Sequence, residues 1–235
     1  MLDSSGNSLH KRGWRISQND APLNENLAAA LIRFTDWNND IPLIDGMCGS
    51  ATILVEAISM AINYPPGLKR NFAFEKWKHF SNEKFNKIKE NAKNQIKYDK
   101  KLKITGIDIS KKSINISRKN LQNAGFLDYV NLINQNFLDY KPSTNEGIII
   151  LNPPYGVRME DQEEILNLYK LIGKKLKFEL SGFTAWIISS NSEALKQIGL
   201  KPSKKITLMN GSLEVKYNKY ELFSGKLKDY KTKLN

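Results

Sequence analysis

Short apolar runs alternate along this chain with longer segments whose apolar residues recur every three or four positions. The runs are typical of buried strands and predict strands at 41–44, 104–107, 129–133, 147–151 and 183–189. The longer segments predict helices at about 22–34, 53–62, 82–101, 110–124, 161–179 and 191–198. Two more strands, 205–209 and 213–223, flank Asn210-Gly211, a pair typical of hairpin turns.

Strands that alternate with helices predict an α/β fold. We expect a Rossmann-like, doubly wound and mostly parallel sheet of seven strands, closed by a C-terminal antiparallel hairpin. Residues 1–40 would form an N-terminal segment and a helix that packs on the main domain, 41–235. A basic insertion at about 64–102 would interrupt that domain.

Length and composition favour one soluble domain. The chain has 235 residues, of which 40% are hydrophobic, enough for a single complete core. It contains no run of 18 apolar residues, and its polar N-terminal stretch lacks the apolar segment of a signal peptide. We therefore expect a cytoplasmic protein with no membrane association.

Cysteine and histidine are scarce. Cys48 is the single cysteine, and the two histidines, His10 and His79, lie far apart in sequence. This excludes an internal disulfide and a cysteine-cluster metal site, so no metal is expected. Cys48 itself is interpreted as a small buried packing residue rather than a nucleophile.

The charge of the chain favours a polyanionic partner. The net charge is +12, and residues 69–103 contain 12 basic against 4 acidic residues. A coding-sequence bias is the alternative, because 30 of the 36 basic residues are Lys and the chain has 25 Asn. The candidate RNA contacts are Lys69, Arg70, Lys84, Lys87 and Arg158. The helix at 82–101 could equally be a solvated face, and Arg158 could pair with Glu160.

Polar or small residues follow three of the predicted strands. They are the loop 45–52, Asp108, and the cluster Asn152-Pro153-Pro154-Tyr155-Gly156. Open α/β sheets bind ligands at the carboxyl ends of their strands, so the three clusters are expected to share one site.

The cluster at 152–156 suits a flat ring that bears an amine. The Asn152 side-chain oxygen and the Pro153 carbonyl could each accept one amine N–H, which would turn the nitrogen lone pair outward. Pro153 and Pro154 fix the backbone, and Tyr155 could stack on a base, a contact worth roughly 1–3 kcal/mol. The structural alternative is a proline-rich turn that closes a strand.

Taken together, these motifs resemble the class I S-adenosylmethionine-dependent methyltransferases. The resemblance is to the group associated with THUMP RNA-binding domains, and within it to the catalytic domain of the bacterial 23S rRNA guanine-N2 methyltransferases of the K/L type. The matching stretches cover most of the chain: 2–6, 9–15, 21–23, 27–29, 45–52, 66–70, 72–77, 152–156 with Arg158, and 210–214.

The resemblance implies S-adenosylmethionine as cofactor and 23S rRNA as substrate, with methyl transfer to a guanine N2 amine. It assigns Asn152, Pro153, Pro154 and Tyr155 to the reaction. The implied cofactor contacts are Asp45, Cys48, Gly49, Ser50, Thr52, Asp108, Ile109, Asn136, Phe137 and Asn152, with Asp139 as a weaker candidate beside Asn136. The THUMP region of the family is absent from this sequence, and a THUMP domain in a longer protein would be the expected partner.

Two departures from the family pattern affect the loop. The usual Asp-Pro is Asp45-Gly46, which is expected to loosen the loop, and the usual second glycine is Ala51, whose methyl group would lie near the cofactor. Both would weaken cofactor binding. Loss of cofactor binding would leave a noncatalytic RNA-binding or ribosome-assembly module as one alternative. A tRNA guanine-N2 or DNA adenine-N6 methyltransferase is another, because the cluster at 152–156 suits any such amine.

Overall fold

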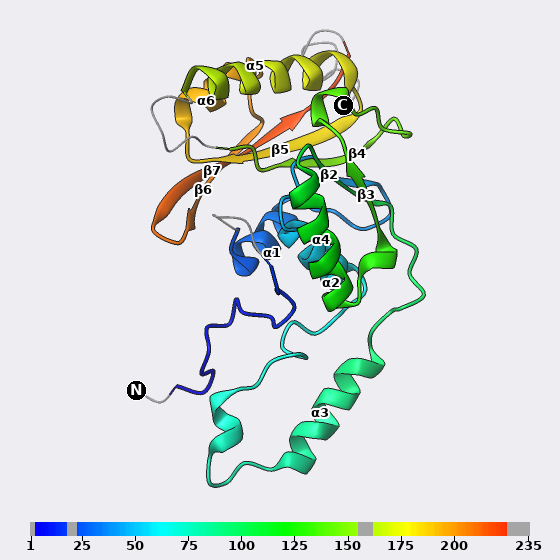
Figure 1. Ribbon diagram of the computed structural model, residues 1–235, viewed down its shortest axis with the longest axis vertical. Coiled ribbons are helices and arrows are strands. Elements are labelled where there is room, and N and C mark those ends of the chain that lie inside the picture. The colour runs from blue at the N-terminus through cyan, green and yellow to red at the C-terminus, as the bar shows by residue number, and fades with distance from the viewer. Residues whose placement is uncertain (1–2, 18–22, 155–161, 225–235) are drawn as a thin grey trace, which may run out of the picture.

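A single seven-stranded sheet organises the protein (Figure 1). The structure is a computed structural model that describes residues 3–17, 23–154 and 162–224. The strand order is β3-β2-β1-β4-β5-β7-β6. The strands are β1 (Leu43–Asp45), β2 (Ile104–Asp108), β3 (Val130–Asn134), β4 (Gly147–Leu151), β5 (Phe183–Ser189), β6 (Lys204–Asn210) and β7 (Leu213–Glu221). Strands β1 to β5 are parallel to one another, and β7 pairs antiparallel with both β5 and β6, so the predicted fold is confirmed.

Helices cover both faces of this sheet (Figure 1). The helices are α1 (Glu25–Phe34), α2 (Thr52–Ala61), α3 (Asn82–Asn94), α4 (Lys111–Ala124), α5 (Gln162–Glu179) and α6 (Ser192–Gln197). Helices α1, α2 and α4 contribute to one apolar core, whereas α5 and α6 contribute to the other. Strand β4 is buried along its whole length because it faces both cores, which explains its continuous apolar sequence.

The described residues also form the short 3-10 turns η1 (Ala73–Lys76), η2 (Leu127–Tyr129) and η3 (Phe137–Asp139). Within the described residues, no helix is long and apolar enough to cross a membrane.

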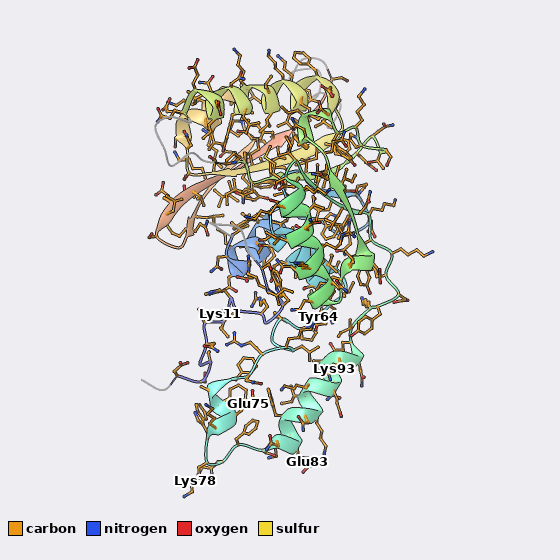
Figure 2. The ribbon with its side chains drawn as sticks, in the orientation of Figure 1. Lys11, Tyr64, Glu75, Lys78, Glu83 and Lys93 are labelled. Atoms are coloured by element: carbon orange, nitrogen blue, oxygen red, sulfur yellow. The ribbon has the colours of Figure 1, made fainter. Side chains whose placement is uncertain are left out.

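Residues 64–103 form an arm that extends away from the sheet and its covering helices (Figure 1). The arm contains η1 and α3, and it has a small aromatic cluster of its own, formed by Phe72, Phe74, Trp77, Phe80 and Phe85. Figure 2 shows Glu75, Lys78 and Glu83 at the far part of the arm and Tyr64 where it leaves the body.

Helix α3 is shorter than the sequence predicts. It ends at Asn94 rather than near residue 101, because the chain turns back to the body there. Ile96 is buried and the Lys97 N–H donates to the Ile62 carbonyl at 2.8 Å. These tertiary contacts outweigh the helix propensity of the lysines that follow.

Candidate active site at the carboxyl edge of the sheet

The chemistry-bearing residues meet where the parallel strands end. Asp45 is the last residue of β1 and pairs with Gly106 of β2 and Ile150 of β4, so Asp108 and Asn152 each lie two residues beyond its level. Because β1 is hydrogen-bonded to both neighbours, the three predicted clusters lie along one edge.

The loop between β1 and α2 is held to both neighbouring strands by its backbone. The Gly46 N–H donates to the Ile150 carbonyl at 3.0 Å, and the Cys48 N–H donates to the Ile107 carbonyl at 2.9 Å. Gly49 and Ala51 both adopt the left-handed conformation, with φ of 54° and 67°. This loop, residues 46–51, is called the cofactor loop below.

Gly46 and Ala51 are both held by their surroundings, whereas their expected effect on cofactor binding stays a prediction. Gly46 is held rather than loose, because a Cβ atom there would lie 2.5 Å from Leu151 and 2.6 Å from Phe137, and its N–H makes a bond that proline could not make. Ala51 is fully buried and belongs to the apolar core, so its methyl group packs there and not toward a ligand.

Asp108 fastens the loop to the end of β2. One carboxylate oxygen accepts the Gly49 N–H at 3.0 Å, and the other accepts the Ser110 N–H at 2.8 Å. An ionised carboxylate has about four acceptor positions, so each oxygen can still accept a hydroxyl. Ile109 follows with 71% of its surface exposed, and it offers an apolar contact beside that carboxylate.

Asp45 has a buried carboxyl group with an incomplete set of partners. One oxygen accepts the Met47 N–H at 3.4 Å, whereas the other is buried without a hydrogen-bond partner among the described residues. Burial raises the pKa of Asp45 to about 8, and the nearby Asp108 adds to this rise. A buried acceptor without a partner is costly, and an incoming cationic amine would satisfy it.

Two of the predicted cofactor contacts instead lie beneath the loop. The Cys48 thiol is buried 3.7 Å from the Ser117 hydroxyl, and burial raises its pKa well above the usual thiol value. Phe137 is buried in the core under Gly46 and α5. Their side chains are buried and support the loop from the core side, and a cofactor contact by either residue stays a prediction.

After β3, Asn136 caps the turn η3, since its side-chain oxygen accepts the Leu138 N–H at 3.0 Å. Asn134, which the sequence did not single out, donates its amide to the carbonyls of Asp108 and Ile109 at 3.0 and 2.9 Å. These two bonds from the end of β3 fix the turn after β2. Because β2 and β3 are neighbouring strands, Asp108 and Asn136 lie at adjacent strand ends.

Beyond β4, Asn152 is partly buried and Pro153 is buried at the same edge, whereas Pro154 is exposed. The predictions for Tyr155, Gly156 and Arg158 lie outside the described residues.

Ser50 and Thr52 are buried and contact a residue that the sequence did not indicate. The Arg15 guanidinium donates to the Ser50 hydroxyl at 3.2 Å and to the Thr52 hydroxyl at 2.9 Å. The partners lie 35 and 37 positions away in the chain, so no local pattern could have revealed them.

Two of the predicted RNA contacts have structural partners. Arg70 is buried and donates to the carbonyls of Ser5, Asn7 and Ser8, so it links the N-terminal segment to the arm, and its contact with RNA stays a prediction. The Lys69 ammonium donates to the Asn123 carbonyl.

Two more of the predicted RNA contacts, Lys84 and Lys87, are on the solvent face of α3. Lys84 and Lys87 are exposed, and Lys87 makes a solvated ion pair with Glu83 at 2.9 Å. Such a pair contributes little to stability, so both ammonium groups can contact a ligand.

The chain matches the family described as "RMKL-like, methyltransferase domain" (UPF0020) over residues 12–219. Among curated proteins it is similar to "Putative RNA methyltransferase YpsC" of Bacillus subtilis, with 35% identity over 93% of this chain and 57% of that protein. It is also similar to "Ribosomal RNA large subunit methyltransferase K/L" of Shewanella oneidensis, with 38% identity over 94% of this chain and 32% of that protein. The chain thus spans between one third and three fifths of these relatives.

Solved structures agree with this placement. "SMU.472, a putative methyltransferase complexed with SAH" superposes with a TM-score of 0.88 and 35% identity, over 96% of this chain and 59% of that chain. A "predicted N6-adenine-specific DNA methylase" from Listeria monocytogenes superposes with a TM-score of 0.85 and 32% identity, over 93% of this chain and 56% of that chain. Since the family match covers most of the chain and the fold agrees, this protein belongs to the RMKL-like methyltransferase domain family.

Proposed function

We propose that this domain transfers a methyl group from S-adenosylmethionine to the exocyclic N2 amine of a guanine in 23S rRNA. The proposal rests on the groups at the carboxyl ends of the neighbouring strands β1 and β4. The unpartnered oxygen of buried Asp45 ends β1, and Asn152-Pro153 follows the adjacent strand β4. A cofactor site and an acceptor site would then be direct neighbours.

The residues on the β1 and β2 side fit the cofactor. The free Asp45 oxygen suits the cationic amine of its methionine part, and the remaining acceptor positions of Asp108 suit two ribose hydroxyls. Exposed Ile109 and the amide of Asn136 would lie against the adenine. When bound, S-adenosylmethionine supplies an electrophilic methyl group.

The residues after β4 would hold the acceptor amine. The Asn152 oxygen and the Pro153 carbonyl would each accept one N–H, so that the nitrogen lone pair points toward the cofactor side of the edge. Orientation would account for much of the rate gain. A strong general base would not be required, because the amine loses its proton readily once it is methylated. Tyr155 would stack on the base.

Three findings support RNA as the substrate. Both curated relatives carry RNA or ribosomal RNA in their names. The net charge of +12 suits a polyanion, and Lys84 and Lys87 are exposed on the arm. Because the chain spans only part of those relatives, a THUMP domain would complete substrate binding in a longer protein.

Two asparagines at the same edge allow a matched test. Asn152→Ala should lower the kcat of RNA methylation about 100-fold and leave the Kd for S-adenosylmethionine within about threefold, because positioning effects act on the chemical step. Asn134→Ala should do the reverse, raising that Kd while kcat is largely kept, since its amide shapes the turn at Asp108. Equal effects of Asn152→Ala on Kd and kcat would contradict the assigned role.

Other acceptors are separated by the same assay. The Listeria relative is named for adenine N6 in DNA, so duplex DNA, tRNA and protein-free 23S rRNA should be compared as substrates. We expect the highest kcat/KM with 23S rRNA. A noncatalytic RNA-binding role is tested by calorimetry, where absence of binding at millimolar S-adenosylmethionine would support it.

A further inference from the structure

Arg15 joins the N-terminal segment to the cofactor loop through four hydrogen bonds. Its guanidinium donates to the Glu25 carboxylate at 2.9 Å, the Leu23 carbonyl at 3.1 Å, and the hydroxyls of Ser50 and Thr52 at 3.2 and 2.9 Å. We propose that Arg15 is a positioning residue that holds the cofactor loop and the start of α2 in the conformation that binds the cofactor. This inference rests on the proposed function, because it takes the loop as the cofactor site.

Burial makes this network specific. The Arg15 side chain is 14% exposed and Glu25 is 7% exposed, so both charges are largely removed from water and require their full set of partners. Arg15 also lies over the Trp14 ring, 4.9 Å from its centroid. Only a planar group with several N–H donors can reach a carboxylate, a carbonyl and two hydroxyls at once, which a lysine ammonium cannot do.

The position of Arg15 points to the loop rather than to helix stability. Thr52 is the first residue of α2, and a cation near a helix N-terminus opposes the helix dipole. Ala51, the residue before α2, provides no side-chain cap. The hydroxyls of Ser50 and Thr52, 3.3 Å apart, are instead oriented by the guanidinium.

The side chain of Asn120 in α4 also connects the N-terminal segment to the cofactor loop. Asn120 is fully buried in α4, and its oxygen accepts the N–H groups of Ile16 and Ser17 at 3.1 and 3.2 Å. Its amide donates to the carbonyls of Ser17 and Ser50 at 2.8 and 3.0 Å. The N-terminal segment is thus bonded directly to the Ser50 side chain by Arg15, and indirectly, through Asn120, to the Ser50 carbonyl, so it forms part of the loop's support.

Arg12 offers a matched control within the same segment. Its side chain is 15% exposed and pairs with the buried Glu56 at 3.3 Å. Glu56 lies one turn into α2, so this pair ties the same segment to the same helix without contact to Ser50 or Thr52. Loss of either arginine leaves a buried carboxylate without its partner, and both variants should lower the melting temperature.

The test compares Arg15→Met with Arg12→Met by calorimetry and steady-state kinetics. We expect Arg15→Met to raise the Kd and KM for S-adenosylmethionine about tenfold or more, with kcat within about threefold, as for loss of one or two hydrogen bonds. Arg12→Met should leave that Kd within about twofold. Arg15→Lys and Arg12→Lys provide the same comparison if a Met variant fails to fold, with a smaller rise for Arg15→Lys.

Four further outcomes decide the role. Equal Kd changes in the Arg15 and Arg12 variants would overturn the inference, as would an unchanged Kd in the Arg15 variants. A double-mutant cycle with Thr52→Val should be non-additive in Kd, and additivity would overturn the loop-mediated role. If the loss vanished with a cofactor analogue that lacks the carboxylate, Arg15 would be a direct ligand and the positioning role would be wrong.

The two proposals can fail separately. If the unmodified protein does not bind S-adenosylmethionine, the proposed function fails. If it binds and the Arg15 variants bind equally well, only the role of Arg15 fails.

Discussion

At the residue scale, the buried carboxyl group of Asp45 gives the site its most distinctive property. One of its oxygens lacks a hydrogen-bond partner among the described residues, and burial raises its pKa to about 8. A buried carboxyl group with a raised pKa favours its neutral form until a cation binds beside it. The same residue would therefore reduce the stability of the free protein and contribute to cofactor binding.

Asp45→Asn should separate these two effects. Between about pH 4 and pH 8, Asp45 is ionised in the unfolded chain but still protonated in the folded protein, so the free energy of unfolding falls as the pH rises. The neutral amide removes this contribution. In urea unfolding at pH 5, 6.5 and 8, the variant should lose less stability with pH than the unmodified protein, while its Kd for S-adenosylmethionine rises.

The exposed Asp128 provides the control for this comparison. Asp128→Asn should leave both the pH dependence and the cofactor Kd unchanged. If Asp45→Asn keeps the full pH dependence of the unmodified protein, the burial of Asp45 does not have the consequence assigned to it.

At the scale of elements, the arm is stabilised largely by its own aromatic cluster. Phe74 contacts four of the rings, with centroids 5.1 to 6.4 Å apart. Its contacts with the rest of the protein lie mainly at its two ends, where Arg70 bonds to the N-terminal segment and Ile96 is buried in the core, and the Phe74 N–H also donates to the Ser4 carbonyl at 3.1 Å. We therefore expect the arm to open without unfolding of the sheet.

Phe74→Ala tests this independence. Phe74 is half-buried, so its truncation should cost less than the about 3–5 kcal/mol of a fully buried Phe, but it removes all four ring contacts at the centre of the cluster. Trypsin should then cleave the arm at its lysines much faster, while the main melting transition and the Kd for S-adenosylmethionine stay the same. Trp77→Ala, at the exposed rim, should have a smaller effect. A loss of cofactor binding in Phe74→Ala would show that arm and site are coupled.

The elements also show how far the sequence predicts the structure. The apolar run at 147–151 is found as β4 because both faces of that strand are buried, so its pattern needs no partner to be recognised. The end of α3 is missed, since nothing local distinguishes Gln95–Lys101 from a helix, and the turn depends on contacts of Ile96 and Lys97 with the body.

At the scale of the whole molecule, strand order explains which site residues the sequence could place. Asp45, Asp108 and Asn152 follow strands, so the parallel sheet brings them to one edge. Arg15 and Arg70 bind backbone carbonyls and side chains far along the chain, and the sequence leaves no signal for such partners. The charge pattern therefore predicts an RNA contact for Arg70 without indicating its structural partners, and it predicts no role for Arg15.

Charge is the other property of the whole molecule, and it bears on RNA binding. The double variant Lys84→Gln with Lys87→Gln should weaken binding to 23S rRNA and reduce the slope of log K against log salt by about 1–2, because each phosphate contact contributes somewhat less than one unit. The Kd for S-adenosylmethionine should stay the same, and filter binding at several salt concentrations measures the slope.

Lys174 and Lys177 are exposed on α5, outside the arm, with the same spacing as Lys84 and Lys87, and they provide the matched control. Their replacement by Gln removes the same charge from another helix and should change RNA binding much less. If both double variants reduce affinity equally, net charge rather than the arm accounts for RNA binding.

Methylation of the guanine N2 amine in 23S rRNA is the activity that we propose for the whole domain. The most direct test incubates protein-free 23S rRNA with the protein and S-adenosylmethionine that carries a labelled methyl group, followed by nucleoside mass spectrometry. We predict that the label appears in N2-methylguanosine and that Asn152→Ala abolishes most of it. Label in N6-methyladenosine, or no label from a protein that binds the cofactor, would contradict the account.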